Sequence, residues 1–222
     1  LPAYAQASAD GEAGRLRLAF VSTVGFDGLP RWVRAFRQQY PNVQLELLEA
    51  TGDVQLQALE RGDIDAGFML HSPGFAPPGL SCQRIAQETL VLALPDQSAL
   101  AHQAKLSLKD VLNQPLVIFP RRIVPSLYDA IFAMYHAAGQ LPDVAQEAIQ
   151  MQTIVNLVSA GLGVAWVPAS VRQFQRSGVV YREISADTVK GQSKALPRCE
   201  TSLVWSGQAS PALTRFRAFV EA

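Results

Sequence analysis

The chain has 222 residues, of which 49% are hydrophobic and 17% charged, and its 19 basic and 19 acidic residues give a formal net charge of zero. This composition is typical of an ordered globular protein and excludes a disordered or fibrous chain. A module that binds DNA by itself carries a basic excess, so we expect these residues to make no DNA contact of their own. No apolar run approaches the ~18 residues of a membrane-spanning helix, which predicts a soluble protein.

The beginning, LPAYAQASADGEAG, indicates that something lies upstream, because it has no initiator Met and no apolar core of a signal peptide. Its small residues resemble the end of a cleaved secretory signal. An alanine-rich interdomain linker would look the same, so both interpretations stay open. The two cysteines, Cys82 and Cys199, form no CxxC pair and are interpreted as free thiols, with a redox switch as the alternative.

Strands and helices alternate over the first third of the chain. Period-two and continuous apolar patterns predict strands, whereas apolar residues three and four apart predict helices. Such an alternation is typical of a parallel sheet covered by helices. The predicted elements are strand 16–22, helix 29–40, strand 43–50, helix 53–61 and strand 64–69.

Two of these helices have a predicted buried face. In the first helix, the residues expected to face inward are Leu29, Val33, Phe36 and Tyr40. In the second helix, Asp53 is expected to cap the start, and Gly62 is expected to end it in a left-handed conformation. The residues of this helix expected to face inward are Val54, Ala58 and Leu59.

The second half of the chain repeats the same alternation, which predicts two α/β lobes. Ser126 is expected to cap one helix, and Ser210 is expected to start the last one. Gly139 and Gly161 are expected to end helices. The predicted elements are strands 89–95 and 115–120, helix 126–138, helix 151–160, strand 163–168, strand 199–206 and helix 210–222.

Polar residues follow several predicted strands at their carboxyl ends, where ligands of open parallel sheets bind. Hydroxyl groups and backbone N–H groups at helix starts favour an anion, of which a carboxylate is the commonest small example. Ser22, Thr51 and Ser126 can also simply cap helices, and the two roles are compatible. The strand-end segments are Ser22–Thr23, Thr51–Gly52, Met69–His71, Phe119–Arg122 and Val167–Ala169. Within them, Arg121 and Arg122 could bind a carboxylate or remain solvated on the surface.

The sequence contains no catalytic signature. HExxH, GxSxG, GxxxxGK and a GxGxxG after a strand are all missing. Of the three histidines, only His71 follows a strand end, while Asp63 and Asp65 lie at a turn, where carboxylates usually cap or solvate. We therefore predict no catalytic residue, no metal ligand and no cofactor.

Taken in order, several segments strongly resemble the effector-binding domain of LysR-type transcriptional regulators. The resemblance spans about residues 14–222, and each segment would be weak alone. The most specific segments are FRQQYPNVQLEL, LERGDIDAGF and GLGVAWVP.

The resemblance implies an α/β fold with two Rossmann-like lobes of the type II periplasmic-binding-protein kind and a ligand cleft between them. It implies a linker remnant in 1–13, one lobe formed by 14–88 and 196–222, and a second lobe formed by 89–195. The chain would cross between lobes near Glu88–Thr89 and Tyr181–Ala195. A winged helix-turn-helix that binds DNA would precede the chain, in a cytoplasmic homodimer or homotetramer.

The resemblance also implies a set of effector-binding residues, for a small effector such as an organic acid, and a dimer interface. Members often read Gly-Thr where this chain has Thr51 and Gly52, so the hydroxyl direction can differ. The implied effector-binding residues are Ser22, Thr23, Thr51, Gly52, Phe68, Pro120, Arg121, Pro125, Ser126, Leu127, Gln150, Met151, Val167 and Pro168. The dimer interface is expected at Trp32, Val33, Phe36 and Tyr40.

Two other classes remain as alternatives. A periplasmic solute-binding protein has the same fold, and secretion would explain the alanine-rich start. An upstream helix-turn-helix would favour the regulator, and a signal peptide the transporter. An enzyme ranks third, because the predicted site residues offer hydroxyls and arginines without an acid–base pair.

Overall fold

The structure is a computed structural model that describes residues 2–26, 28–184 and 196–220. The chain forms two compact units. Unit 1 comprises residues 1–70, 74–86 and 200–222, and unit 2 comprises residues 71–73 and 87–199. Residues 185–195, which include most of the second predicted crossing, lie outside the described residues.

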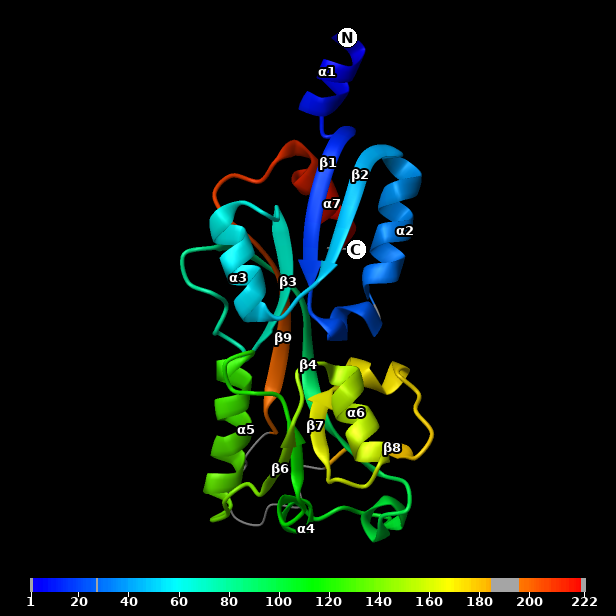
Figure 1. Cartoon of the computed structure of the whole chain (residues 1–222), viewed down its shortest axis with the longest axis vertical. Helices are drawn as coiled ribbons and strands as arrows, with labels where there is room; N and C mark the ends of the chain where they lie inside the picture. The colour runs from blue at the N-terminus through cyan, green and yellow to red at the C-terminus, as the bar shows by residue number, and fades with distance from the viewer. Residues whose placement is uncertain (1, 27, 185–195, 221–222) are drawn as a thin grey trace. The chain divides into compact units, whose positions relative to one another are not determined.

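Unit 1 is built on a sheet in which β1, β2 and β3 run parallel (Figure 1). Its strands follow the order β2-β1-β3-β9-β4, and β1 is parallel to both β2 and β3. The elements are α1 (Pro2–Ala9), β1 (Ala13–Phe20), the 3-10 helix η1 (Ser22–Phe26), α2 (Gly28–Gln39), β2 (Asn42–Glu49), α3 (Gly52–Arg61), β3 (Ala66–His71), the start of β4 (Ser81–Pro95), most of β9 (Arg198–Trp205) and α7 (Pro211–Val220). The predicted order of strands and helices is therefore confirmed.

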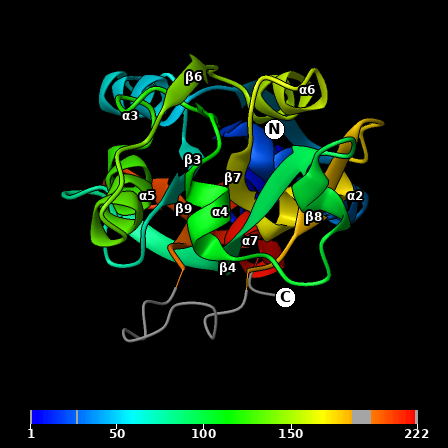
Figure 2. The ribbon, with the colours of Figure 1, turned by 90° about the horizontal axis from the view of Figure 1, so that it is seen from below.

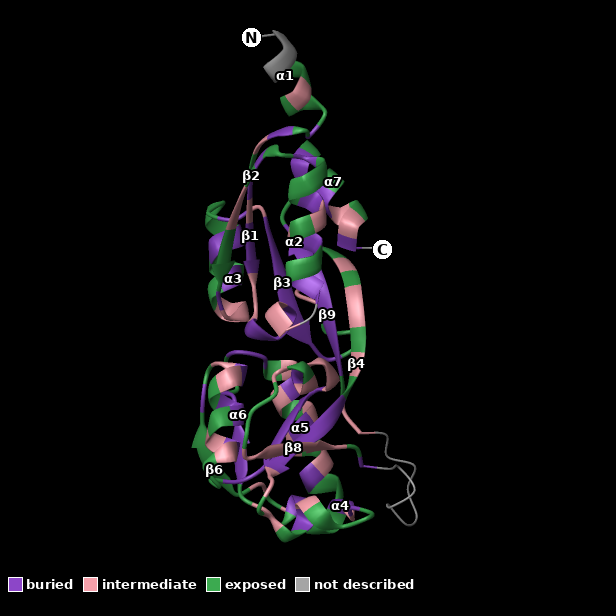
Figure 3. Ribbon diagram, turned by 90° about the vertical axis from the view of Figure 1, so that its right-hand side faces the viewer, coloured by how far each residue is buried: buried purple, intermediate pink, exposed green. Residues whose placement is uncertain are grey.

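Helices lie on both faces of this sheet, and its inner strand β3 is buried at every position, whereas the edge strand β2 is mostly exposed (Figure 3). Leu18 and Phe68 belong to the cluster that also contains α2 and α7 residues. Their neighbours Ala19 and Met69 belong to a second cluster, which contains residues of α3. Successive side chains of a strand point to opposite faces, which explains why adjacent residues enter different clusters. Burial on both faces also explains why β3 reads as a nearly continuous apolar run.

Aromatic rings fill the core beneath α2. Phe36 is fully buried, and its ring lies 5.2 Å from that of Phe216. Trp32 is 8% exposed and stacks on Phe68 at 5.4 Å. The predicted inward position of Val33 is wrong in part, because Trp32 takes the central place and Val33 is only half-buried. A large ring one position earlier in the helix fills the space above β3 better than an isopropyl group.

The start of α3 differs from the prediction. Thr51, not Asp53, occupies the N-cap position, and the Thr51 hydroxyl donates a hydrogen bond to Asp53. Val54 is 44% exposed, while Gln55 is fully buried. The prediction from the apolar pattern is therefore wrong in the first turn, where the inward-facing residue is Gln55 rather than Val54. The end is as predicted, since Gly62 has φ 71° in the left-handed region.

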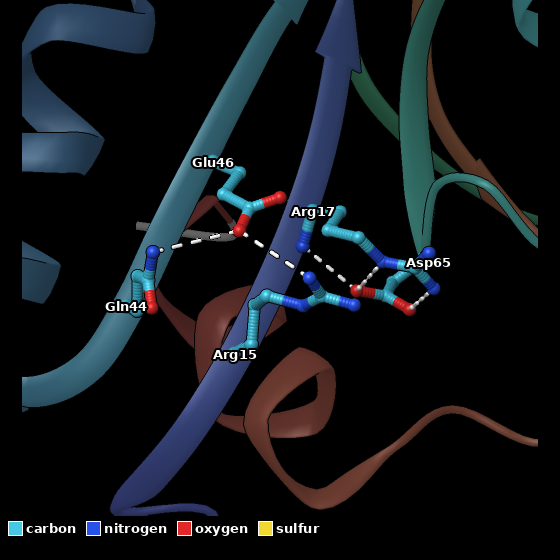
Figure 4. Close-up of polar contacts among 5 residues, drawn as sticks. All are labelled: Arg15, Arg17, Gln44, Glu46 and Asp65. Atoms are coloured by element: carbon cyan, nitrogen blue, oxygen red, sulfur yellow. Dashed lines mark hydrogen bonds and ion pairs between the residues drawn. The ribbon is translucent and has the colours of Figure 1, made fainter.

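An ion pair fixes the amino-terminal end of the sheet (Figure 4). Asp65 accepts hydrogen bonds from the backbone N–H of Arg17 at 2.7 Å and from its Nη2 at 2.8 Å. The backbone N–H of Asp65 donates to the Arg17 carbonyl at 2.8 Å. This reciprocal set connects β1 to the turn before β3, whereas the neighbouring Arg15–Glu46 pair is longer, at 3.6 Å.

Unit 2 has an antiparallel part and a parallel part. β4 pairs with β7 and β8, and both pairs are antiparallel. β5 and β6 pair in parallel, and α5 and α6 lie to either side of β7 (Figure 2). The elements are the end of β4, the 3-10 helix η2 (Ala99–His102), α4 (Leu108–Leu112), β5 (Leu116–Ile118), α5 (Pro125–Ala137), β6 (Val144–Glu147), α6 (Met151–Ser159), β7 (Ala165–Pro168), the 3-10 helix η3 (Ala169–Gln173) and β8 (Val179–Arg182).

Several predictions in unit 2 are confirmed and two strands were missed. Gly139 and Gly161 have φ values of 73° and 82° and follow the ends of α5 and α6. The missed strands are β6, whose four residues are all exposed, and β8, whose residues are all half-buried. A short strand without alternation between buried and exposed positions gives no period-two signal.

The described residues contain no helix long and apolar enough to cross a membrane. The α/β class predicted from the sequence is confirmed, since both units combine strands and helices. Cys82 is exposed, while Cys199 is buried with its Sγ 3.8 Å from the Glu88 carbonyl oxygen. Ser210 starts α7 as predicted, since its hydroxyl accepts a hydrogen bond from the Leu213 N–H at 3.2 Å.

Replacing Asp65 by Ala should lower the free energy of unfolding by about 1–3 kcal/mol, because the part-buried Arg17 N–H loses its charged partner. Asp63→Ala is the matched control, since the Arg61–Asp63 pair is more than half exposed and such pairs contribute ~0–1 kcal/mol. Urea unfolding followed by circular dichroism measures both. Equal stabilities of the two variants would contradict a special role for Asp65.

Stability should also fall at high pH through Tyr181. Its hydroxyl donates to the Phe174 carbonyl at 2.9 Å, and burial raises its pKa to about 12. Tyrosine titrates at about 10 in an unfolded chain. The raised folded pKa means that the contribution of the protonated form is complete below pH ~10 and is lost as the pH rises towards ~12. Urea midpoints of Tyr181→Phe should fall less over this window than those of the wild type, and parallel pH profiles would refute this.

Candidate ligand-binding site

In unit 1, the polar residues after β1 are packed rather than exposed. Ser22 and Thr23 open η1, and they are 8% and 6% exposed. The Thr23 hydroxyl is buried and has no hydrogen-bond partner among the described residues. A buried hydroxyl without a partner carries a desolvation cost, so this atom can gain from a polar ligand or a water molecule.

The start of α3 already carries a negative charge. Thr51 and Gly52 lie between β2 and α3, and the Thr51 hydroxyl donates its proton to Asp53 in the first turn. An acidic residue in this position is favourable to the helix dipole. Because the Thr51 proton is donated to Asp53, the hydroxyl of Thr51 offers a ligand acceptor lone pairs rather than a donor.

Gln55 connects the ends of two strands in unit 1. Its Nε2 donates to the Ala50 carbonyl at 2.8 Å and to the Phe68 carbonyl at 3.1 Å. Its Oε1 is buried without a partner among the described residues. The sequence did contain a signal for Gln55. It precedes Ala58 by three positions and Leu59 by four, so it lies on the same inward face of the helix.

In unit 2, Ser126 lies in the first turn of α5. Its Oγ accepts a hydrogen bond from the Ser72 backbone N–H at 3.0 Å. The prediction that Ser126 caps this helix is wrong, because Val124 occupies the N-cap position and Pro125 the first helical position. Proline is pre-organised for that first position and lacks the N–H group that would be left unpaired there. The hydroxyl is thus presented beside the helix start.

Arg121 binds a carboxylate of its own unit. Its Nε and Nη2 donate to the two carboxylate oxygens of Asp129, each at 2.7 Å. This hydrogen-bonded pairing lowers the pKa of Asp129, and both side chains are more than half exposed. The guanidinium expected to bind a ligand carboxylate is therefore already engaged in a two-pronged pair.

A second internal carboxylate occupies the start of η3. Glu88 accepts a hydrogen bond from the Ser170 backbone N–H at 2.6 Å and another from its hydroxyl at 3.2 Å. Pro168, at the end of β7, precedes this segment. Because the negative charge of Glu88 holds these donors, the end of β7 is a poor place for a second anion.

The other residues predicted for the effector site differ in how far they are buried. Gln150 occupies the N-cap position of α6, and Met151, which is 6% exposed, begins the helix. Phe68, Leu127 and Val167 are at most 1% exposed and lie in the core of their own units. Pro120 follows β5 and is buried as well.

Sequence reasoning missed three polar residues that hold these segments: Gln55, Ser72 and Glu88. A serine in a proline-rich loop and a glutamate in a long strand give no pattern of their own. His71, the histidine expected near a ligand, is 4% exposed, and its Nδ1 lies 2.8 Å from the Ser72 carbonyl. Within the described ranges, no group of three or more His, Cys, Asp or Glu side chains could hold a metal ion.

Two α/β units with polar residues at strand ends and helix starts define a small-molecule binding domain of the periplasmic-binding-protein kind. The model of the family described as the LysR substrate binding domain matches residues 9–222. The chain belongs to the LysR substrate-binding domain family, which confirms the resemblance seen in the sequence.

Two relatives illustrate the family. The chain is 40% identical over 215 residues to the HTH-type transcriptional regulator IlvR of Caulobacter vibrioides, a match that covers 96% of this chain and 69% of IlvR. It is 33% identical over 180 residues to the HTH-type transcriptional regulator AlsR of Bacillus subtilis, covering 81% of this chain and 59% of AlsR. The chain thus corresponds to part of the length of these transcriptional regulators.

Solved structures agree with this assignment. CbnR, a LysR family transcriptional regulator, superimposes with a TM-score of 0.77 at 27% identity, covering 99% of this chain and 73% of CbnR. The effector-binding domain of BenM with its effector benzoate gives a TM-score of 0.72 at 23% identity, covering 93% of this chain and 90% of that one. The BenM match shows a shared fold.

Proposed function

We propose that this chain is the effector-sensing part of a longer LysR-type transcriptional regulator and that its effector is a small organic acid. The effector biases the regulator between states that differ in DNA binding or promoter activation. Any such switch requires the effector to bind one state more tightly than the other. DNA is contacted by residues outside this chain, which is consistent with its formal net charge of zero.

The Ser126 hydroxyl carries this proposal. It accepts a hydrogen bond from the Ser72 N–H, so its own proton remains available to a ligand oxygen. It lies in the first turn of α5, a helix of 13 residues, where backbone N–H groups lack partners within the helix and the dipole favours negative charge. A hydroxyl donor beside a helix start is suited to a carboxylate.

We assign the effector contacts to the members of the expected set that lie at strand ends and helix starts, and a supporting role to the three that are at most 1% exposed. Phe68, Leu127 and Val167 are in the core, so they act by holding their polar neighbours in place. Arg121 is engaged with Asp129, which makes it a weaker candidate than Ser126. The residues proposed for the effector site are Ser22, Thr23, Thr51, Gly52, Pro120, Arg121, Pro125, Ser126, Gln150, Met151 and Pro168, with Phe68, Leu127 and Val167 behind them.

The regulator is favoured over the two other classes. The 40% identity to IlvR, over 96% of this chain, supports a regulator rather than a periplasmic solute-binding protein. The proposed site residues supply hydroxyls and helix starts without an acid–base pair, which supports binding without catalysis. A regulator of transcription acts where the chromosome is, so we place the full protein in the bacterial cytoplasm.

We further propose that the chain forms a homodimer, or part of a homotetramer, through the outer side of α2. The rings of Trp32, Phe36 and Tyr40 are used inside unit 1, which leaves Val33 and the polar outer side of the helix for a partner. A groove of about 670 Å³ follows the boundary between α2 and α7. α2 holds three arginines and α7 two, and neither helix contains Asp or Glu, so this contact should be sensitive to salt.

The melting temperature of this chain should rise with one or more members of a panel of benzoate, acetate, isovalerate and pyruvate, and not with glucose. At 100 times its dissociation constant, a ligand stabilises the native state by about 2.7 kcal/mol. Ser126→Ala should weaken the binding of that acid by about tenfold, the equivalent of ~1.4 kcal/mol, because a donor to a charged oxygen is lost. Arg121→Ala should change it less. A loss confined to Arg121→Ala would refute the assignment to Ser126.

The dimer contact can be tested by sedimentation equilibrium. The double replacement Arg34→Glu with Arg37→Glu, on the exposed side of α2, should weaken self-association by about tenfold, since each charge reversal places like charge against a complementary partner surface. Arg61→Glu, on α3, is the control. Self-association that is unchanged in the double variant, or a wild type that stays monomeric at high concentration, would exclude this interface.

A further inference from the structure

Gln55 is a fully buried amide on the inward face of α3. A buried amide is unfavourable unless it is hydrogen-bonded, and both donors of this one are used. Nε2 donates to the Ala50 carbonyl at 2.8 Å and to the Phe68 carbonyl at 3.1 Å. The first carbonyl follows β2 and the second lies in β3.

The two carbonyls lie on opposite sides of β1, because the strand order is β2-β1-β3. The Ala50 N–H donates to the Phe20 carbonyl at 3.0 Å, and the Val21 N–H donates to the Phe68 carbonyl at 3.2 Å. The Gln55 amide therefore completes a continuous set of hydrogen bonds that includes backbone groups of β3 and of the residues that end or follow β1 and β2. Ser22 directly follows Val21, and Thr51 directly follows Ala50.

The Gln55 amide fits against the sheet because the residue beside it, Gly67, has no side chain. A Cβ atom added at Gly67 would lie 2.2 Å from the Gln55 Oε1. Any other residue at this position would displace the amide, since real Cβ atoms do not approach an oxygen so closely. Glycine at position 67 is thus matched to glutamine at position 55.

Stability alone does not account for this amide. Its Oε1 is buried without a partner among the described residues, and such a group costs about 1–3 kcal/mol. An unbranched apolar side chain of similar length would fill the same space without that cost. The feature that only the amide provides is the pair of donors that connects the two strand ends.

We propose that Gln55 is a positioning residue of the effector site, which fixes the Ser22–Thr23 and Thr51–Gly52 segments relative to each other. The proposal rests on the proposed function, because it assumes that these segments contact the effector. Gln55 itself does not touch the effector. It acts through the backbone of Ala50 and Phe68.

The test uses Gln55→Met, which keeps the length of the side chain and removes its donors. Gln57→Met on the exposed side of the same helix is the matched control. Amide hydrogen exchange is measured first, without ligand. Exchange should become faster in residues 20–24 and 50–55 of Gln55→Met and stay unchanged elsewhere. Unchanged exchange in these two segments, or a variant that does not fold, would overturn the proposal and leave Gln55 with a role in the core only.

The second measurement titrates both variants with whichever of benzoate, acetate, isovalerate or pyruvate stabilises the wild type. The dissociation constant should rise about tenfold for Gln55→Met, equivalent to ~1.4 kcal/mol, and stay unchanged for Gln57→Met. Equal dissociation constants for the two variants would overturn the positioning role. A wild type that binds none of these acids would count against the proposed ligand class, while the exchange measurement still decides whether Gln55 positions the two segments.

Discussion

The inner strand β3 of the unit 1 sheet is buried at every position, and this constraint determines where polar chemistry can lie along it. Because α2 and α7 pack on one face and α3 on the other, a polar side chain that points from β3 towards either face is buried. At the strand ends, backbone N–H and C=O groups that have no partner in a neighbouring strand can bond to polar side chains instead. At one end Asp65 satisfies Arg17, and at the other the Gln55 amide satisfies Ala50 and Phe68.

Internal carboxylates then decide which helix starts remain available to an anionic ligand. Asp53 occupies the start of α3, and Glu88 occupies the start of η3. Asp129 neutralises Arg121, the cation that the sequence suggested for a ligand. The starts of α5 and α6 in unit 2 carry no acidic residue in their first turns. At the start of α5, the Ser126 hydroxyl accepts from Ser72, and it is the donor that we propose for the effector.

The arginines of α2 and α7 mark a surface that we propose for subunit contact rather than for effector binding. These two helices contain no acidic residue, although the chain as a whole is neutral. Their apolar side holds the aromatic core of unit 1, and their outer side is cationic. We therefore propose ligand binding and subunit contact for different residues of the chain, which allows each to be altered by substitution without changing the other.

The sequence by itself determined the alternation of strands and helices, the glycine-terminated helices and the family, because periodicity and left-handed turns depend on local chemistry. It also placed Ser22, Thr51 and Ser126 at strand ends or helix starts. It could not show that Trp32 rather than Val33 fills the core, or that Gln55 rather than Val54 faces the sheet, since these choices depend on the shape of the opposite surface. Only the tertiary structure showed that Arg121 is paired with Asp129 and that Ser126 accepts from Ser72, because those partners are brought together by folding rather than by spacing along the chain.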